Sequence, residues 1–301
     1  MNVKILVCCH KKDVMATQEP YLPIHVGKAL HPEVELGIQG DNTGDNISEK
    51  NGSYCELTGM YWAWKNLKDV DIIGLCHYRR YFDFHGQCQK FSPISMFDEK
   101  EFDSMNLDIP FDILNKVSKK GAIVVSKKIS YNIPLILDYC ASHIADDYRV
   151  LNYVIHKTQE NKYINAFHKV MEKRVNMSNF NMFIMKWDDF DAYCQWLFKI
   201  LSEVEKYTDI NGYTPFQKRI YGYMAERLFN VWLEAEKKKT IKRPVIWINY
   251  RFNHSLVRRL FHILRNAYCS FLCKMHPKIK ICPIVLEENN AHFLRNNTNL
   301  N

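Results

Sequence analysis

The first part of the chain is patterned as the strands of an α/β sheet. Apolar runs end there abruptly in polar or charged residues, as buried strands of a parallel sheet do. These runs are VKILVCC at 3–9, IIGLC at 72–76 and AIVVS at 122–126. Long connections rich in proline and glycine lie between the first two runs, so the pattern predicts an α/β sheet with a functional loop region.

Helical spacing of apolar positions predicts a helix over residues 55–67, with Ser53 as its candidate cap. From Leu135 onward this spacing dominates and predicts a helical second part. The predicted helices cover 135–157, 161–174, 187–207 and 216–239. Two compact apolar runs, 180–187 and 244–252, are instead predicted as strands.

Composition fits one globular α/β domain at 1–252, followed by a basic extension at 253–301. The chain has 301 residues, of which 47% are hydrophobic, and this is ample material for a core. We find no internal repeat and no low-complexity linker. The cysteines lie mostly inside apolar segments without a secretory leader, so we expect reduced thiols in a cytoplasmic protein.

Positive charge is concentrated near the C-terminus, although the net charge of the whole chain is only +8. Residues 237–280 contain lysines and arginines but no Asp or Glu. Residues 253–280 also place apolar positions near one helical face, which fits an interfacial helix on anionic lipid or a helix packed on the domain. Nucleic acid is not an expected partner, because no RNA-binding fingerprint occurs and the charge is confined to this part.

Two adjacent arginines, Arg79 and Arg80, follow the predicted strand at 72–76, with His77 and Tyr78 before them. Ligands of open α/β sheets bind beyond the carboxyl ends of the strands. A guanidinium is a planar donor fork that matches phosphate oxygens, so both arginines are candidates for a diphosphate site. The alternative is an ion pair with a carboxylate. The carboxylates considered are Asp41, Asp45, Asp71 and Asp83.

An acidic loop, GDNTGDNISEKN at 40–51, is a candidate metal site. Asp41, Asp45 and Glu49 could ligate a hard cation such as Mg²⁺ or Mn²⁺, and Asn42, Asn46 and Ser48 could support the turn. The alternative is a solvated turn held by side-chain hydrogen bonds, because the spacing is not that of an EF-hand.

Two carboxylates of the helical part are candidates for a general base. Asp147 shares a predicted helix face with His143, either as a catalytic pair or as a surface contact. Glu226 precedes Arg227 and is either a catalytic carboxylate or half of an internal ion pair. Phosphate-cradling glycine loops, nucleophile elbows and HExxH zinc motifs do not occur in the sequence.

The ordered motifs YCELTGMYWAWKN, DIIGLCHYRRYF, NFNMFIMKWDDFDAYCQWLF and YGYMAERLFNVWL resemble the bacterial capsular and exopolysaccharide glycosyltransferases grouped as domain of unknown function 4422. The resemblance covers 3–247 and is most specific over 44–82. It implies a GT-A-like fold, with a single, mostly parallel sheet flanked by helices. A nucleotide sugar would lie across the strand ends, and an acceptor would enter from the helical side.

The resemblance also implies an activity: transfer of a sugar from a UDP-sugar donor to a hydroxyl of a growing lipid-linked glycan. Characterised relatives include galactofuranosyltransferases, so galactose or galactofuranose is the suggested sugar. The lipid-linked acceptor implies a cytoplasmic protein at the inner face of the cell membrane. The alternative is a non-catalytic protein of the same pathway that binds a nucleotide sugar or a glycan.

Most GT-A enzymes bind a metal through an Asp-x-Asp motif at the strand end where this chain has His77 to Arg80. Either the two arginines neutralise the leaving UDP, or Asp41 and Asp45 bring in a divalent cation. The residues expected at the nucleotide and diphosphate are His10, Lys11, Asp41, Asp45, Asn46, His77, Arg79 and Arg80. Those expected at the acceptor or sugar are His143, Asn181 and Trp64. For Trp64 the alternative is packing in the core. Asp147 is the first candidate base and Glu226 the second.

Overall fold

A computed structural model describes residues 1–248 of the chain, and within them ten strands form one sheet. Its main path has the spatial order β11 (Thr240–Arg243), β7 (Ile123–Ser126), β10 (Phe183–Lys186), β4 (Ile72–His77), β1 (Val3–Cys9), β2 (Tyr21–His25) and β3 (Gln39–Gly40). β4 lies at the centre of this path, and its neighbour β1 is parallel to both β4 and β2. The inserted strand β10 is antiparallel to both of its neighbours, β4 and β7.

A side branch extends the sheet beyond the end of β4. It contains β5 (Arg80–Phe82), β12 (Val245–Ile248) and β6 (Ile94–Phe97). β5 turns back along β4 directly after the Tyr78–Arg79 turn, and β12 pairs with β5 and β6. A separate two-stranded ladder joins β8 (Ile129–Ser130) to β9 (Asn176–Met177). The branch brings Trp247 beside Arg80.

Alternate residues of the strands face two hydrophobic clusters, as the period of two in a strand requires. Ile5 and Val7 of β1 join the cluster beneath α3 (Phe111–Lys120), whereas Leu6 and Cys8 join the larger cluster on the other face. That larger cluster includes residues of α2 (Leu57–Asn66) and α7 (Trp187–Glu205). The strands are therefore covered on both faces, and the predicted α/β sheet flanked by helices is confirmed.

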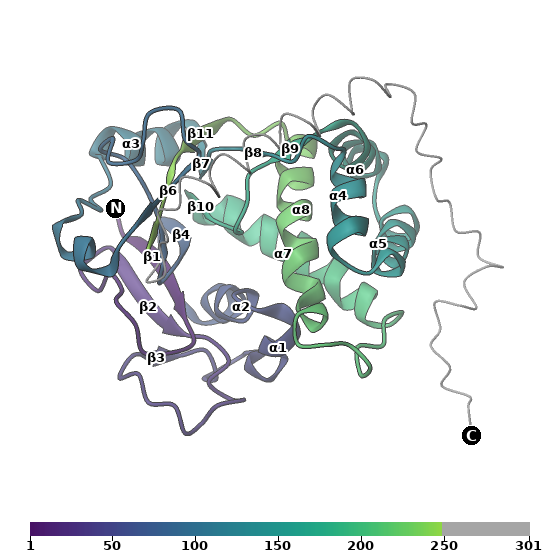
Figure 1. Ribbon diagram of the computed structural model, residues 1–301, viewed down its shortest axis with the longest axis horizontal. Helices are drawn as coiled ribbons and strands as arrows, with labels where there is room; N and C mark the ends of the chain where they lie inside the picture. Colours follow the sequence, from purple (N-terminus) through teal and green to yellow (C-terminus); the bar gives the residue numbers. More distant parts are fainter. Residues whose placement is uncertain (249–301) are drawn as a thin grey trace, which may run out of the picture.

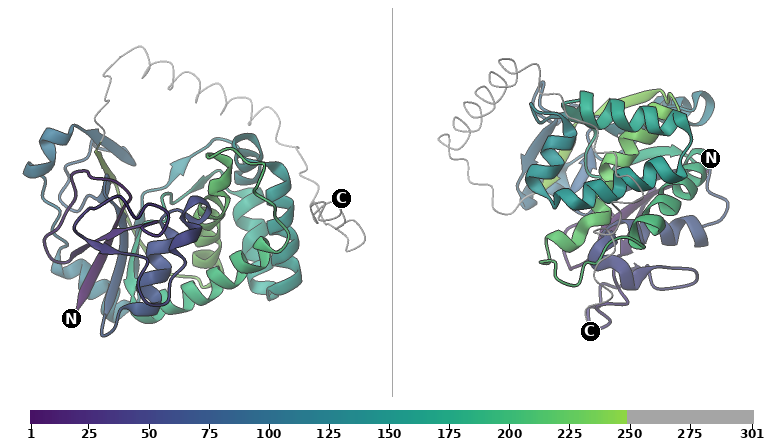
Figure 2. Two further views of the ribbon diagram at one scale, coloured as in Figure 1. Left: turned by 90° about the horizontal axis from the view of Figure 1, so that it is seen from below. Right: turned by 90° about the vertical axis from the view of Figure 1, so that its right-hand side faces the viewer.

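The remaining helices form a lobe beside the sheet (Figure 1). They are α1 (Asn51–Tyr54), α4 (Leu135–Ser142), α5 (Ala145–Thr158), α6 (Asn161–Lys173) and α8 (Ile220–Ala235). In Figures 1 and 2, α4 to α6 lie farther from the sheet than α8. Short 3₁₀ turns cover Ser48–Lys50, Glu99–Ser104 and Gln217–Arg219. α8 therefore stands between the sheet and the outer helices.

The helix predicted over 135–157 is two helices. α4 ends at Ser142, and His143 is extended with φ −136° and ψ −179° before α5 begins. The prediction that His143 and Asp147 share one helix face was therefore wrong. The helix predicted from residue 55 begins at Leu57, and Ser53 lies inside α1 rather than capping α2.

The described cysteines are all free, in agreement with the predicted reduced state. Among residues 1–248, no helix has both the length and the hydrophobicity that a membrane span requires. The basic extension predicted at 253–301 lies outside the described residues, as does the end of the strand predicted over 244–252.

Candidate active site

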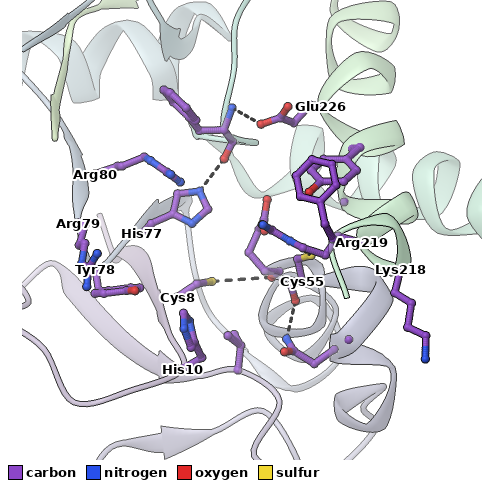
Figure 3. Close-up of a pocket in the computed structure, with 18 of the residues that line it drawn as sticks. Cys8, His10, Cys55, His77, Tyr78, Arg79, Arg80, Lys218, Arg219 and Glu226 are labelled. Atoms are coloured by element: carbon purple, nitrogen blue, oxygen red, sulfur yellow. Dashed lines mark hydrogen bonds between the residues drawn. The ribbon is translucent and has the colours of Figure 1, made fainter. Parts of the chain in front are cut away.

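A cavity of about 950 Å³ opens beyond the carboxyl ends of β1 and β4, between the sheet and the helical lobe. His10 follows β1 at one side, and the segment from His77 to Arg80 follows β4. The opposite wall comes from the junction of α1 with α2 and from the start of α8 (Figure 3). This position at the strand ends is where open α/β sheets bind ligands.

Arg79 lines the cavity but already has a carboxylate partner. Its Nη2 and Nε donate to Oδ2 of Asp13 at 2.8 and 3.1 Å, and the Asp13 side chain is 0% exposed. Asp13 follows β1, the strand next to β4, so adjacent strand ends bring the pair together. It is none of the four carboxylates that the sequence suggested. Arg79 is therefore held at the cavity edge by an ion pair.

Arg80 lies in the same wall without such a partner. Its guanidinium packs between the rings of Phe180 and Trp247, 4.6 and 4.4 Å from their centroids. Its Nε is buried and makes no hydrogen bond, and no ion pair of Arg80 occurs within residues 1–248. Burial lowers the pKa of Arg80, while the carboxylates of Glu56 and Glu226 oppose this shift. A buried cation held by two aromatic rings is suited to an anionic ligand.

A second arginine, Arg219, faces the cavity from the helical side. Its Nε donates to Sγ of Cys55 at 3.2 Å, and its guanidinium lies 5.4 Å from the ring centroid of Tyr223. No carboxylate lies within ion-pair distance of Arg219 in the described part of the chain. Lys218 adds a further cationic side chain to the rim. The cavity thus presents positive charge from both walls.

Glu226 faces the cavity from α8, with 18% of its side chain exposed. Its Oε1 accepts a 2.8 Å hydrogen bond from the main-chain N–H of Phe180, and its Oε2 lies 3.7 Å from Nη1 of Arg227. Arg227 is paired more closely with Asp138, at 2.9 Å. Burial raises the pKa of Glu226 above its usual value, and Arg227 opposes this shift.

His77 lies across from Glu226 at the end of β4. Its Nε2 is 2.7 Å from the carbonyl oxygen of Phe180, so this nitrogen carries a proton and donates. Burial lowers the pKa of His77 to about 3, and the nearby Arg80 contributes to the shift. The imidazole is therefore neutral near pH 7, with Nδ1 left as an acceptor.

Glu56 is a second carboxylate of the cavity, placed between α1 and α2. Its Oε1 accepts a 2.7 Å hydrogen bond from the side-chain amide of Asn181, which is itself buried. The preceding residue, Cys55, has φ 54° and ψ −131°, an unusual conformation for a side chain with a Cβ. This turn aims Glu56 into the cavity. Asn181 thus positions a cavity carboxylate without lining the cavity.

Asp147 does not reach the cavity. It is buried in the first turn of α5, where the hydroxyl of Tyr213 donates to its Oδ1 at 2.7 Å. Burial raises the pKa of Asp147 to about 6, against the effect of that hydrogen bond. His143 is also absent from the lining, but its ring stacks on Tyr223, with centroids 4.1 Å apart. His143 therefore supports the helical wall from behind.

In the acidic loop at 40–51, Asn51 lines the cavity, but the predicted ligands Asp41 and Asp45 lie outside the lining. Asp41 is fully buried, and its oxygens accept from the main-chain N–H groups of Gly27 and Lys28 and from the Ser48 hydroxyl. Asp45 is exposed and accepts from the hydroxyl of Tyr61. Asp41 therefore stabilises the loop by accepting these hydrogen bonds.

Three further predicted residues make local contacts away from the cavity lining. Asn46 bonds the main chain of its own turn. Lys11 is half exposed, 3.8 Å from Asp13. Trp64 donates to Asp191 at 2.7 Å and stacks on Phe198, so its ring is used in packing.

The described residues do not fit a metal site at the place where the wider fold family binds one. Asp41 has its oxygens occupied by hydrogen bonds and is separated from the cavity lining, as is Asp45. Within residues 1–248, no three His, Cys, Asp or Glu side chains converge in a way that could hold an ion.

Sequence reasoning missed most of the helical wall. The cavity side chains of this wall follow the spacing i, i+3, i+4 and i+7, which places them on one helix face. They are Arg219, Gly222, Tyr223 and Glu226. A Cβ on Gly222 would lie 3.2 Å from Sγ of Cys55, so α8 packs closely on the turn that carries Glu56. The sequence signal that could have indicated this wall is the recurrence of these positions on one face of the predicted helix, beside its apolar face.

Comparison with known proteins gives one solved structure of similar fold: the apo structure of WbbM, described as a bifunctional glycosyltransferase. The TM-score is 0.69 and the identity 28%, over 83% of this chain and 46% of that one, so the chain matches less than half of WbbM. No curated protein matches the sequence. A family model matches residues 4–238, and the chain therefore belongs to the family described as Domain of unknown function (DUF4422).

Proposed function

We propose that the protein is a glycosyltransferase that takes a sugar from a UDP-sugar and transfers it to a hydroxyl of a growing, lipid-linked capsular or exopolysaccharide glycan. The observation that carries the proposal is a pair of cavity arginines, Arg80 and Arg219, that make no ion pair with a carboxylate among residues 1–248. They lie on opposite walls of the cavity, which is also lined by the carboxylates of Glu56 and Glu226. The similarity to a glycosyltransferase structure supports the same reading.

In this proposal the cationic side chains bind the donor diphosphate and stabilise the leaving UDP. Negative charge grows on the diphosphate as its bond to the anomeric carbon breaks. Arg80 approaches from the sheet and Arg219 from the helical lobe, so donors are available on two sides of the group. Because Arg80 is held between two rings, little reorganisation is needed when the charge develops.

Glu226 is the proposed general base. The acceptor oxygen attacks the anomeric carbon, the bond from that carbon to the diphosphate oxygen breaks, and the acceptor proton passes to the Glu226 carboxylate. Its raised pKa makes the carboxylate a stronger base than an exposed glutamate, and the Phe180 amide fixes one of its oxygens. Glu56, on the neighbouring wall, is the alternative base.

The proposed function also specifies the sugar donor, the absence of a need for a divalent cation, and the location of the protein in the cell. UDP-galactose and UDP-galactofuranose are the donors to test first, and leaving-group stabilisation is assigned to arginine rather than to Mg²⁺ or Mn²⁺. The basic residues beyond 248 would attach the protein to the anionic inner face of the cell membrane, where a lipid-linked acceptor is found.

A UDP-release assay over UDP-sugars and simple glycosides, run with chelator and with Mn²⁺ or Mg²⁺, tests this. We expect turnover that survives chelator and falls at least 100-fold in Arg80→Met and in Arg219→Met. Arg149→Met is the matched control, because Arg149 pairs with Asp146 on the exposed start of α5. Full activity in both cavity variants would refute the arginine mechanism.

Thermal unfolding with a nucleotide panel separates catalysis from binding. A nucleotide at 100 times its Kd adds about 2.7 kcal/mol of stability. Stabilisation by UDP without turnover of any UDP-sugar would favour a non-catalytic binding protein. No response to any nucleoside diphosphate would contradict both functions.

A further inference from the structure

An exposed phenylalanine stands in the rim of the cavity. Phe216 lines the cavity, and 54% of its surface is exposed. A single exposed apolar side chain is common on protein surfaces, but the place of Phe216 in the cavity lining makes its ring available to a bound ligand. Among residues 1–248, the other phenylalanines of high exposure are Phe91 and Phe111, and both lie outside the cavity lining.

Two further rings hold Phe216 in place. The Phe216 and His143 rings are nearly parallel, at 18°, with centroids 5.9 Å apart, and Tyr223 lies 5.4 Å from Phe216. Burial lowers the pKa of His143 to about 4, with Arg227 contributing, so its ring is neutral near pH 7. The three rings come from the end of α4, the turn before α8 and α8 itself. A supported ring loses little entropy when a ligand packs on it.

The stack belongs to the helical wall, together with the proposed base. Tyr223 and Glu226 are three residues apart on α8 and share one helix face. Arg80 and His77 belong to the opposite wall, as Figure 3 shows. A ligand on Phe216 would therefore lie on the Glu226 side of the cavity, away from the strand ends that would hold the donor.

Polar groups surround this aromatic surface. Arg219 lies over the Tyr223 ring, and Lys218 is close by in the sequence and in the rim. A ring face bordered by a few fixed donors suits a sugar, whose C–H face packs on the ring while its hydroxyls accept hydrogen bonds. An isoprenoid chain would need a continuous apolar groove, which this charged border does not provide.

We propose that Phe216, supported by Tyr223 and His143, is the subsite that binds a sugar ring of the acceptor. The inference rests on the proposed transferase function and adds to it the residue that positions the acceptor. The acceptor glycan then presents its hydroxyl to Glu226 from the helical side, while the UDP-sugar lies toward the strand ends, with its diphosphate between Arg80 and Arg219.

The test compares transfer to methyl glycosides of hexopyranoses and disaccharides in wild type, Phe216→Ala and Phe216→Trp. We expect Phe216→Ala to raise the acceptor KM about tenfold while the donor KM and the acceptor-independent release of UDP stay unchanged. Phe216→Trp should restore the acceptor KM. Phe111→Ala, which removes an exposed ring outside the cavity, should match wild type.

Saturation-transfer NMR of the same methyl glycosides in the presence of UDP gives a readout that does not require turnover. A wild-type signal that is lost in Phe216→Ala supports the subsite. Octyl glycosides of the same sugars are assayed in parallel. The inference is overturned by an unchanged acceptor KM in Phe216→Ala, by no wild-type signal with any methyl glycoside, or by an effect of Phe216→Ala that is confined to the octyl glycosides. The last result would assign Phe216 to the lipid. UDP binding and turnover of UDP-sugars remain independent measures of the proposed function.

Discussion

The main-chain amide of Phe180 donates to Glu226 at 2.8 Å, while the carbonyl of the same residue accepts from His77 at 2.7 Å. Phe180 has φ 74°, in the left-handed region, and the next residue, Asn181, has φ 53°. Such conformations cost energy and persist where the surroundings enforce them, often at functional sites. One peptide segment before β10 thus orients the proposed base on one wall and a neutral imidazole on the other.

Replacing Glu226 by glutamine should remove the proposed base with little change in shape. We expect Glu226→Gln to lower kcat 100- to 10,000-fold, while UDP binding, followed by thermal shift, is retained. Since burial raises the pKa of Glu226, the acid limb of the wild-type rate profile should lie above the ordinary value of 4.5. Glu203→Gln on the exposed face of α7 is the control. A kcat within threefold of wild type would transfer the role to Glu56.

His77 should make the fold sensitive to mild acid. Its pKa is about 3 in the folded protein and 6.5 ordinarily, so the folded state favours the neutral ring. The neutral ring makes its full contribution to the free energy of unfolding above pH 6.5. This contribution is lost as the pH drops toward 3, and about 2 kcal/mol of it is lost at pH 5. His77→Gln keeps a donor for Phe180 but does not titrate.

Denaturant unfolding at pH 7 and pH 5 measures this difference. The wild type should lose about 2 kcal/mol more than His77→Gln between the two pH values, and His31→Gln, at an exposed position, should follow the wild type. Parallel losses in wild type and His77→Gln would show that the folded protein does not hold this imidazole neutral.

The two adjacent arginines should differ in what they stabilise. Arg79→Met breaks the ion pair with the buried Asp13 side chain and should cost about 2 kcal/mol or more of folding stability. Arg80→Met removes a buried cation without an ion-pair partner among residues 1–248, so the stability should change by less than about 1 kcal/mol. Affinity for UDP should instead fall about tenfold or more in Arg80→Met. Equal destabilisation by both variants would contradict this division.

The strands and the family could be recognised from sequence because both depend on local patterns. Apolar runs ending in charge marked β1 and β4, and the segment after β4 does line a cavity. The partner of Arg79 was not predictable, because Asp13 becomes its neighbour only when β1 and β4 pair in parallel. Strand order is a property of the whole fold and cannot be predicted from a short sequence motif.

The carboxylates show the same limit. From the sequence, Asp147 was the first candidate base and Glu226 the second, and each is an acidic residue in a predicted helical segment. Residues that are distant in sequence form their surroundings. Tyr213, which hydrogen-bonds Asp147, is 66 positions away from it, and Phe180, which hydrogen-bonds Glu226, is 46 positions away. Burial and hydrogen bonding decide the role of a carboxylate, and both depend on tertiary packing.

Asp147 should act on stability rather than on chemistry. Its pKa is about 6 when folded and 3.8 ordinarily, so the folded state favours the protonated acid, and stability is lost as the pH rises from 4 through 6. Asp147→Asn keeps an acceptor for the Tyr213 hydroxyl without the charge. Its free energy of unfolding should exceed that of the wild type by about 3 kcal/mol at pH 7 and match it at pH 4, and its kcat should stay within about twofold of wild type. A hundredfold loss of kcat with intact UDP binding would instead identify Asp147 as the base.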